Sequence, residues 1–154
     1  MADWSTRLAA LGITLPPVAA PVAAYAPAVR SGTLVYTSGQ LPFVDGALTA
    51  TGKVGADVPA EQAKDLARSC ALNALAAVHA LVGIDAVVRV VKVVGFVASA
   101  PGFTGQPGVL NGASELLGEV FGEEGVHARS AVGVAELPLD APVEVELIVE
   151  LRSL

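Results

Sequence analysis

Hydrophobic residues near the start of the chain recur at the spacing of an amphipathic helix and then give way to prolines. Trp4, Leu8 and Leu11 lie three or four residues apart, which predicts a short helix over residues 3–11 that Gly12 ends. Residues 15–27 contain four prolines, and this density excludes a helix interior or a central strand. We therefore expect an extended arm before the first strand.

Runs of β-prone residues follow the arm. Residues 28–30 and 33–38 predict two strands of a hairpin joined through Ser31-Gly32, a dipeptide suited to a tight turn. Residues 85–99 are rich in valine and predict a central strand covered on both faces. Between these segments, residues 43–57 contain Asp-Gly and Thr-Gly pairs and predict a surface loop or a small hairpin.

Two longer segments show the three-to-four-residue periodicity of helices with a buried stripe. A proline opens the first, which runs over residues 59–82 and ends at Gly83. The second runs over about residues 107–121, and Gly122 ends it. The order hairpin, helix, strand, helix, hairpin predicts an α+β fold in which two helices pack on one face of a mixed sheet.

The last predicted hairpin combines a permanent cation with two carboxylates. Arg129 opens a run of small and β-branched residues, a Leu-Pro turn follows, and the strand over residues 143–147 has Glu144 and Glu146 on one face. The cation and the carboxylates are therefore expected on neighbouring strands. A guanidinium suits a planar carboxylate, because its fixed fork donates two parallel hydrogen bonds. The alternative is a solvated arginine at a strand edge, paired with an acid.

Composition changes this picture by suggesting an assembly. The chain has 154 residues, which we interpret as a single domain over 1–154 with a short helix and a proline-rich arm at about 1–27. Hydrophobic residues make up 53% and charged residues only 16%, and the mean hydropathy is +0.63. No apolar run approaches the roughly 20 residues that cross a bilayer. The excess apolar surface is therefore expected at a subunit interface.

Charge and residue counts exclude several classes of site. A net charge of −6 argues against nucleic acid as a partner, because phosphate binding rests on Lys and Arg. The start of the chain lacks a signal-peptide pattern, so we expect a cytoplasmic protein. One cysteine and two histidines give no zinc cluster, and we expect no metal. Cys70 falls in the buried stripe of the first long helix, where a thiol is inert.

Four further residues would matter only if they reached a common site. The Ser38 hydroxyl and the Gly39 amide follow a strand, where a ligand can approach, but they also suit a plain turn. Tyr25 is the one polar-tipped side chain of the arm and equally suits an aromatic anchor. Asn111 lies in the first turns of the second long helix, where asparagine is commonly structural.

Together, these residues resemble the Rid/YjgF family of reactive-intermediate deaminases over roughly residues 21–151. The resemblance rests on Tyr25 before the hairpin, on Asn111, and on Thr37-Ser38-Gly39-Gln40-Leu41-Pro42. Its strongest part is Ala128-Arg129-Ser130-Ala131-Val132, followed by Glu136-Leu137-Pro138 and Val143-Glu144-Val145-Glu146.

The resemblance implies a chorismate-mutase-like fold, homotrimers with sites in the clefts between subunits, and no cofactor. By position, Arg129 would bind the substrate carboxylate and Glu144 would hold or activate water, with the arginine keeping that glutamate ionised. The pocket would be completed by Tyr25, Ser38, Gly39, Asn111 and Ala131. The implied reaction is hydrolysis of imines and enamines of the 2-aminoacrylate type to 2-keto acids and ammonia.

Two departures from the family keep a second function open. Ala131 stands where many members carry a cysteine, and Gly133 where many carry a bulkier or charged residue. A larger and less polar pocket is therefore expected near both positions. The chain is then either a deaminase or a trimeric binder of small carboxylates without turnover, and ammonia release from freshly generated 2-aminoacrylate separates the two. The acidic composition argues against a third class, an endoribonuclease.

Overall fold

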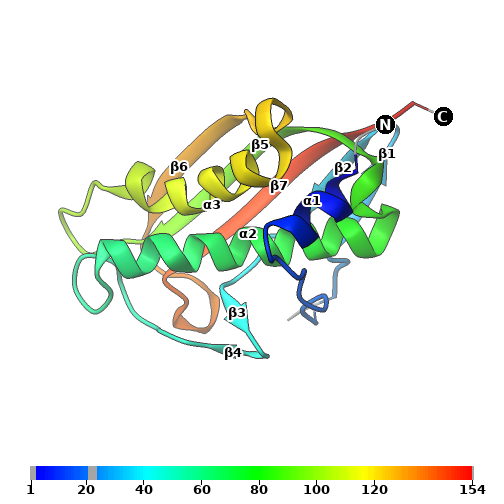
Figure 1. Cartoon of the computed structure of the whole chain (residues 1–154). Coiled ribbons are helices and arrows are strands. Elements are labelled where there is room, and N and C mark those ends of the chain that lie inside the picture. Colours follow the sequence, from blue (N-terminus) through cyan, green and yellow to red (C-terminus); the bar gives the residue numbers. More distant parts are fainter. Residues whose placement is uncertain (1–2, 21–23, 154) are drawn as a thin grey trace.

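A computed structural model describes residues 3–20 and 24–153, and its elements follow the predicted order (Figure 1). The helices are α1 (Trp4–Ala10), α2 (Ala60–Val82) and α3 (Gln106–Phe121), with short 3-10 turns at Ile84–Ala86, Gly122–Gly125 and Pro138–Asp140. The strands are β1 (Ala28–Ser31), β2 (Leu34–Thr37), β3 (Phe43–Val44), β4 (Ala47–Leu48), β5 (Val87–Ala98), β6 (Ala128–Val134) and β7 (Val143–Leu151).

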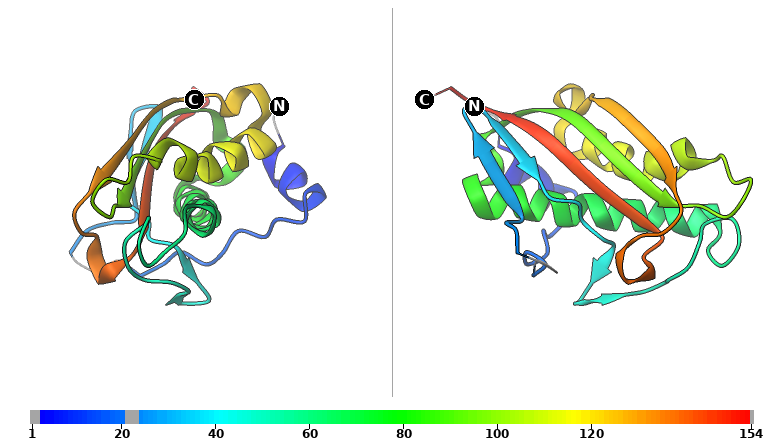
Figure 2. Two further views of the ribbon diagram at one scale, coloured as in Figure 1. Left: turned by 90° about the vertical axis from the view of Figure 1, so that its left-hand side faces the viewer. Right: turned by 180° about the vertical axis from the view of Figure 1, so that it is seen from behind.

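Five strands form a mixed sheet in the order β1-β2-β7-β5-β6. Neighbouring strands are antiparallel except β5 and β6, which are parallel. The helices lie on one side of this sheet (Figure 1), and the view from behind shows the other side without a helix (Figure 2). The predicted α+β class, with helices on one face of a mixed sheet, is confirmed. In the described part of the chain, no helix has the length and apolar character needed to cross a membrane.

The final two strands do not form the predicted hairpin. Among the described strands, β6 pairs only with β5, and β7 lies on the other side of β5. A parallel pair needs a crossover, which α3 supplies between β5 and β6. The prediction was wrong because a Leu-Pro turn reverses the chain but does not determine which strand the returning segment pairs with. Arg129 on β6 and Glu144 on β7 are therefore separated by β5.

Only one face of the sheet is fully buried. On β5, Val90, Val93 and Val97 are completely covered on the helix side, whereas Val94 and Phe96 on the other side are only half-buried. A single chain therefore does not bury both faces of β5, although the sequence predicted that both would be covered. We call the uncovered side the open face. Strand register and alternation assign to it Val29, Tyr36, Val94, Phe96, Val132, Glu144, Glu146 and Ile148.

The segments before the sheet match the prediction in most details. Asp3 caps α1 by accepting a hydrogen bond from the Thr6 amide at 3.0 Å, and the Trp4 indole donates to the Val87 carbonyl at 2.8 Å. Described residues of the arm form neither helix nor strand, while Pro21 lies outside the described residues. Residues 43–48 form the small hairpin β3–β4.

The turn of the first hairpin is one residue later than predicted. Ser31 pairs with Leu34, so the central residues are Gly32 and Thr33 rather than Ser31 and Gly32. Gly32 has a φ of 61°, which favours glycine at this turn.

Close contact between α2 and α3 depends on Gly112. A methyl group at this position would overlap the carbonyl oxygen of Lys64 on α2. Gly118, on the same helix, has no heavy atom within 4 Å of the position a methyl would take. We expect Gly112→Ala to lower the free energy of unfolding by about 2 kcal/mol through overpacking. Gly118→Ala should instead raise it by about 0.5–1 kcal/mol, because alanine favours a helix.

Urea denaturation of both variants tests this pair, since each adds one methyl group to the same helix. Equal changes in the free energy of unfolding would contradict a close contact at Gly112.

Candidate functional site

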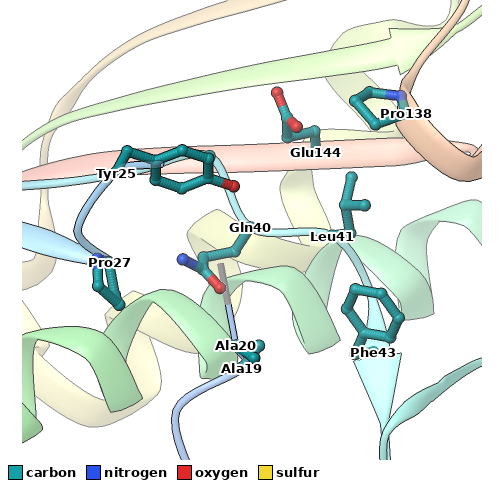
Figure 3. Close-up of a pocket in the computed structure, with 10 residues that line it drawn as sticks. Ala19, Ala20, Tyr25, Pro27, Gln40, Leu41, Phe43, Pro138 and Glu144 are labelled. Atoms are coloured by element: carbon teal, nitrogen blue, oxygen red, sulfur yellow. The ribbon is translucent and has the colours of Figure 1, made fainter. Parts of the chain in front are cut away.

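A pocket opens where the end of β2 meets the start of β7, with the arm along one side (Figure 3). We call it the strand-end pocket. The residues that line it include Tyr25, Gly39, Gln40, Leu41, Pro138 and Glu144. Three of the predicted site residues, Tyr25, Gly39 and Glu144, are thus brought together from distant parts of the sequence.

Gly39 allows the chain to pass directly against the carboxyl group of Glu144. A Cβ atom at position 39 would lie 2.7 Å from Cδ of Glu144, which is closer than real side chains come. The next residue fixes this approach, because the Gln40 amide donates to the Val145 carbonyl at 2.8 Å and the Val145 amide donates back to the Gln40 carbonyl at 3.0 Å. Glycine here therefore leaves room for the present position of the Glu144 carboxyl group, which any side chain at position 39 would displace, and it does not serve a turn.

The Ser38 hydroxyl supports the pocket from beside it. It donates to the Ala26 carbonyl at 2.6 Å, and the Ser38 amide donates to the Pro27 carbonyl at 2.8 Å. Ser38 is not among the residues that line the pocket. Both hydrogen bonds tie the arm to the end of β2, so Ser38 holds the segment that carries Tyr25.

Glu144 is half-buried in an apolar setting. Burial raises the pKa of Glu144 above its ordinary value, and the charge of Glu146 raises it further. Within residues 3–20 and 24–153, no lysine or arginine forms an ion pair with Glu144. Arg129 of the same chain therefore does not keep this glutamate ionised, and the expectation stays a prediction for a site between subunits.

Glu146 shares the open face with Glu144, as predicted, but its surroundings differ. It lines a separate hollow with Tyr36, Lys92 and Ile148. Glu144 instead faces Gly39 and the arm. Alternation along a strand does not distinguish the two carboxylates, whereas the segments packed against them do.

Arg129 points to the opposite face of the sheet. It is in register with Val93, which is in register with Leu147, and both of these residues are buried under the helices. Glu144 is in register with Phe96 on the open face. Because side chains alternate along a strand, Arg129 and Glu144 project from opposite sides. One chain does not bring them into a common site.

Three acceptors on α3 hold the guanidinium of Arg129. Its Nη1 donates to Oδ1 of Asn111 at 2.9 Å and to Oγ of Ser114 at 3.1 Å, and its Nη2 donates to the Pro107 carbonyl at 3.3 Å. These acceptors lie at positions i, i+4 and i+7 of the helix, which form one face. Asn111 is thus brought to Arg129, as expected for one site, but not to Tyr25. We call Pro107, Asn111, Ser114, His127 and Arg129 the arginine cluster.

No acid neutralises Arg129 in the part of the chain that the structure describes. The alternative of a strand-edge arginine paired with an acid is therefore not observed. Among described residues, Nε and one hydrogen of Nη2 also have no acceptor. The guanidinium therefore keeps donors that can hydrogen-bond a carboxylate, the planar anion that its fork suits.

Ala131 and Gly133 lie on the same face of β6 as Arg129. Ala131 is half-buried and packs against the core. A Cβ atom at Gly133 would lie 2.7 Å from Nε2 of Gln106 and 2.9 Å from Oγ of Ser99. Polar side chains therefore fill the space beside Gly133, and the prediction of a larger, less polar pocket is wrong at that position.

Sequence reasoning missed Ser114, His127 and Gln106. Their roles depend on the packing of α3 over β6, although the helical spacing of Asn111 and Ser114 was a usable signal. Cys70 is fully buried, and burial raises the pKa of its thiol, as expected for an inert residue. Over the described ranges, no group of three or more His, Cys, Asp or Glu residues is arranged to hold a metal ion.

Comparison with known proteins gives consistent matches over nearly the whole chain. Residues 5–151 match the family model described as "YjgF/chorismate mutase-like, putative endoribonuclease". Protein TCP17 of Trypanosoma cruzi is 48% identical over 151 residues, which cover 97% of this chain and 94% of that protein.

Solved structures share the fold. The crystal structure described as a putative endoribonuclease from Shewanella oneidensis has a TM-score of 0.93 at 33% identity, covering 97% of this chain and all of that one. E. coli TdcF, crystallised with bound serine, has a TM-score of 0.64 at 25% identity, covering 91% of this chain and 96% of that one.

Proposed function

Because this chain belongs to the YjgF/chorismate mutase-like family, we propose that it hydrolyses small imines and enamines that carry a carboxylate, releasing 2-keto acids and ammonia. The observation that carries this proposal is the guanidinium of Arg129, which neutral acceptors hold in place and no described acid neutralises. Such a group suits the carboxylate common to these substrates. The serine bound to E. coli TdcF also carries a carboxylate next to an amino group, which supports this class of ligand.

We propose that the complete site forms between two subunits. The arginine cluster and the strand-end pocket each hold only part of the required chemistry within one chain. A neighbouring copy would bring its arginine cluster to the strand-end pocket, so that a carboxylate on Arg129 presents its imine carbon to Glu144. This arrangement accounts for two half-sites on opposite faces of one sheet.

The reaction would need only positioning and proton transfer. Water adds to the carbon of the C=N bond while its proton passes to Glu144, and the electron pair of the double bond moves to nitrogen, which takes that proton from Glu144. In the tetrahedral adduct the hydroxyl proton passes by way of Glu144 to nitrogen, the C–N bond breaks to release ammonia, and the C=O bond forms. A carboxylate with a raised pKa suits both steps, because it holds a proton more readily and still returns it to the leaving nitrogen.

The test is the decay of 2-aminoacrylate, generated continuously by a pyridoxal-phosphate lyase, with and without this protein. We expect faster release of ammonia and pyruvate than the spontaneous reaction gives. A protein that binds pyruvate but leaves the rate unchanged would be the carboxylate binder without turnover, and the deaminase proposal would fail. Cleavage of RNA under the same conditions would instead support the activity in the family's description, which the net charge of −6 disfavours.

A homotrimer is the assembly that we expect in solution. The open face exposes apolar side chains, with Val29 56%, Tyr36 44% and Val132 43% accessible in the single chain. Sedimentation equilibrium should give three times the chain mass of 15.4 kDa. Val132→Asp should shift the protein toward monomers, because it would bury a carboxylate in the interface. Val126→Asp is the matched control, since Val126 is 70% exposed outside the sheet and should leave the mass unchanged.

A wild-type protein that stays monomeric at micromolar concentration would contradict both the trimer and a site shared between subunits.

A further inference from the structure

We propose that Ser114 and His127 are positioning residues for Arg129, and that they form a hydrogen-bonded relay with a fixed direction. The relay runs from the Gly125 carbonyl through His127 and Ser114 to the guanidinium. Its effect on ligand binding rests on the proposed function, because it concerns how Arg129 would hold a carboxylate.

The direction of the relay follows from which groups can donate. A backbone carbonyl only accepts, so Nδ1 of His127, at 2.6 Å from the Gly125 carbonyl, must carry a proton. In the neutral ring, Nε2 is then a bare acceptor. It lies 2.9 Å from Oγ of Ser114, which therefore donates its single proton to it.

That donation leaves the lone pairs of Ser114 for Arg129. The guanidinium only donates, and its Nη1 reaches Oγ of Ser114 at 3.1 Å. A hydroxyl that donates to an imidazole is also a stronger acceptor, because hydrogen bonds in a chain polarise one another. The second hydrogen of Nη1 goes to Asn111. Both hydrogens of Nη1 are therefore occupied, and together with the contact from Nη2 to the Pro107 carbonyl they fix the guanidinium plane.

His79 provides an internal comparison for the tautomer. Its Nδ1 accepts a hydrogen bond from the Ile84 amide at 3.1 Å, so this nitrogen must be bare and Nε2 must carry the proton. The chain has only two histidines. We therefore expect opposite neutral tautomers, Nδ1–H at His127 and Nε2–H at His79.

The first measurement is ¹⁵N NMR of the imidazoles at about pH 8, above the ordinary pKa of histidine. Protonated and bare ring nitrogens have well-separated shifts, and His127→Gln assigns the signals. An Nε2–H tautomer at His127 would overturn the relay, because Nδ1 could not then donate to Gly125. The second measurement is the rotation of the Arg129 guanidinium, which should become faster in Ser114→Ala. Unchanged rotation would also overturn the proposal.

The third measurement is the affinity for pyruvate, followed by NMR shift titration. We expect Ser114→Ala to weaken binding about fivefold, the loss of one of several hydrogen bonds to a charged group. Ser114→Thr keeps the hydroxyl and should stay within about twofold of wild type. Ser69→Ala is the matched control, because Ser69 is a half-buried helix serine on α2, far from the cluster in sequence.

The effect should disappear when Arg129 is absent. In an Arg129→Ala background, Ser114→Ala should change the affinity for pyruvate by less than about twofold, since positioning residues act through their target. An equal loss in both backgrounds would overturn the positioning role. Alanine is a strong helix former, so Ser114→Ala is expected to fold. If wild type binds no 2-keto acid, the proposed function fails, while the tautomer and the rotation of Arg129 still decide whether the relay exists.

Discussion

Replacing Glu144 with glutamine is expected to slow imine hydrolysis by a factor on the order of 10²–10⁴, the usual contribution of a positioned acid–base group. Glutamine has nearly the same shape and still accepts a hydrogen bond, but it cannot take a proton from water. The measurement is the rate of ammonia release from 2-aminoacrylate, at protein concentrations where the wild-type rate is proportional to the amount of protein.

Glu146→Gln is the matched control for this prediction. Glu146 lies two residues along the same strand and on the same face, but in the hollow beside Lys92. It should keep most of the activity. Full activity in Glu144→Gln together with loss of activity in Glu146→Gln would show that Glu146, and not Glu144, carries the proposed acid–base role.

The same Glu144→Gln substitution should make the folded protein more stable near neutral pH. The pKa of Glu144 is raised by burial, so the folded chain binds this proton more tightly than the unfolded chain does. Ionising Glu144 therefore destabilises the folded protein. This loss is absent below the pKa of Glu144 in the unfolded chain, grows between that pKa and the higher pKa in the folded chain, and stays constant above it. Urea denaturation at about pH 3 and pH 7, on either side of the ordinary glutamate range, should show the gain only at the higher pH.

Arg129→Ala is expected to weaken the binding of a small 2-keto acid by about 2–5 kcal/mol, as for other charge pairs that are desolvated and hydrogen-bonded. The loss follows from the three fixed contacts to α3, which hold the guanidinium before any ligand arrives. Titration calorimetry with pyruvate measures it. Lysine keeps the charge but loses the fork, so Arg129→Lys should recover only part of the affinity.

Arg7→Ala is a suitable control, because Arg7 also donates to α3 through a contact with the Glu119 carbonyl at 3.0 Å. It should leave the affinity unchanged. If Arg129 served only to join β6 to α3, Arg129→Ala would lower the melting temperature and leave pyruvate binding intact in the folded assembly. Retained affinity in a folded Ala variant would therefore defeat the carboxylate role.

Local patterns predicted the elements well, because each signal acts within a few residues. The stops at Gly83 and Gly122 and the small hairpin around Asp45 follow from backbone preferences that need no distant partner. Strand order depends instead on contacts between segments far apart. The chain turns at Pro138, but the position of β7 between β2 and β5 is set by which faces become buried.

The same distinction applies to the candidate site. Arg129, Glu144, Tyr25 and Gly39 were selected from the sequence, and the structure brings the last three together. It places Arg129 on the other face, because Arg129 is in register with the buried Val93, whereas Glu144 is in register with Phe96 on the open face. His127 was counted only in excluding a zinc cluster, since its link to Ser114 requires α3 to lie over β6.

The central position of β7 has a consequence for how the chain folds. β1 and β2 form one local unit and β5, α3 and β6 form another. Among the described strands of the sheet, the two units are joined only by β7, which follows both in the sequence. Closing the sheet therefore requires pairing Leu34 with Glu150, a separation of more than a hundred residues, and such non-local contacts make folding slow. During synthesis, both halves would expose an unpaired strand edge until β7 has been made.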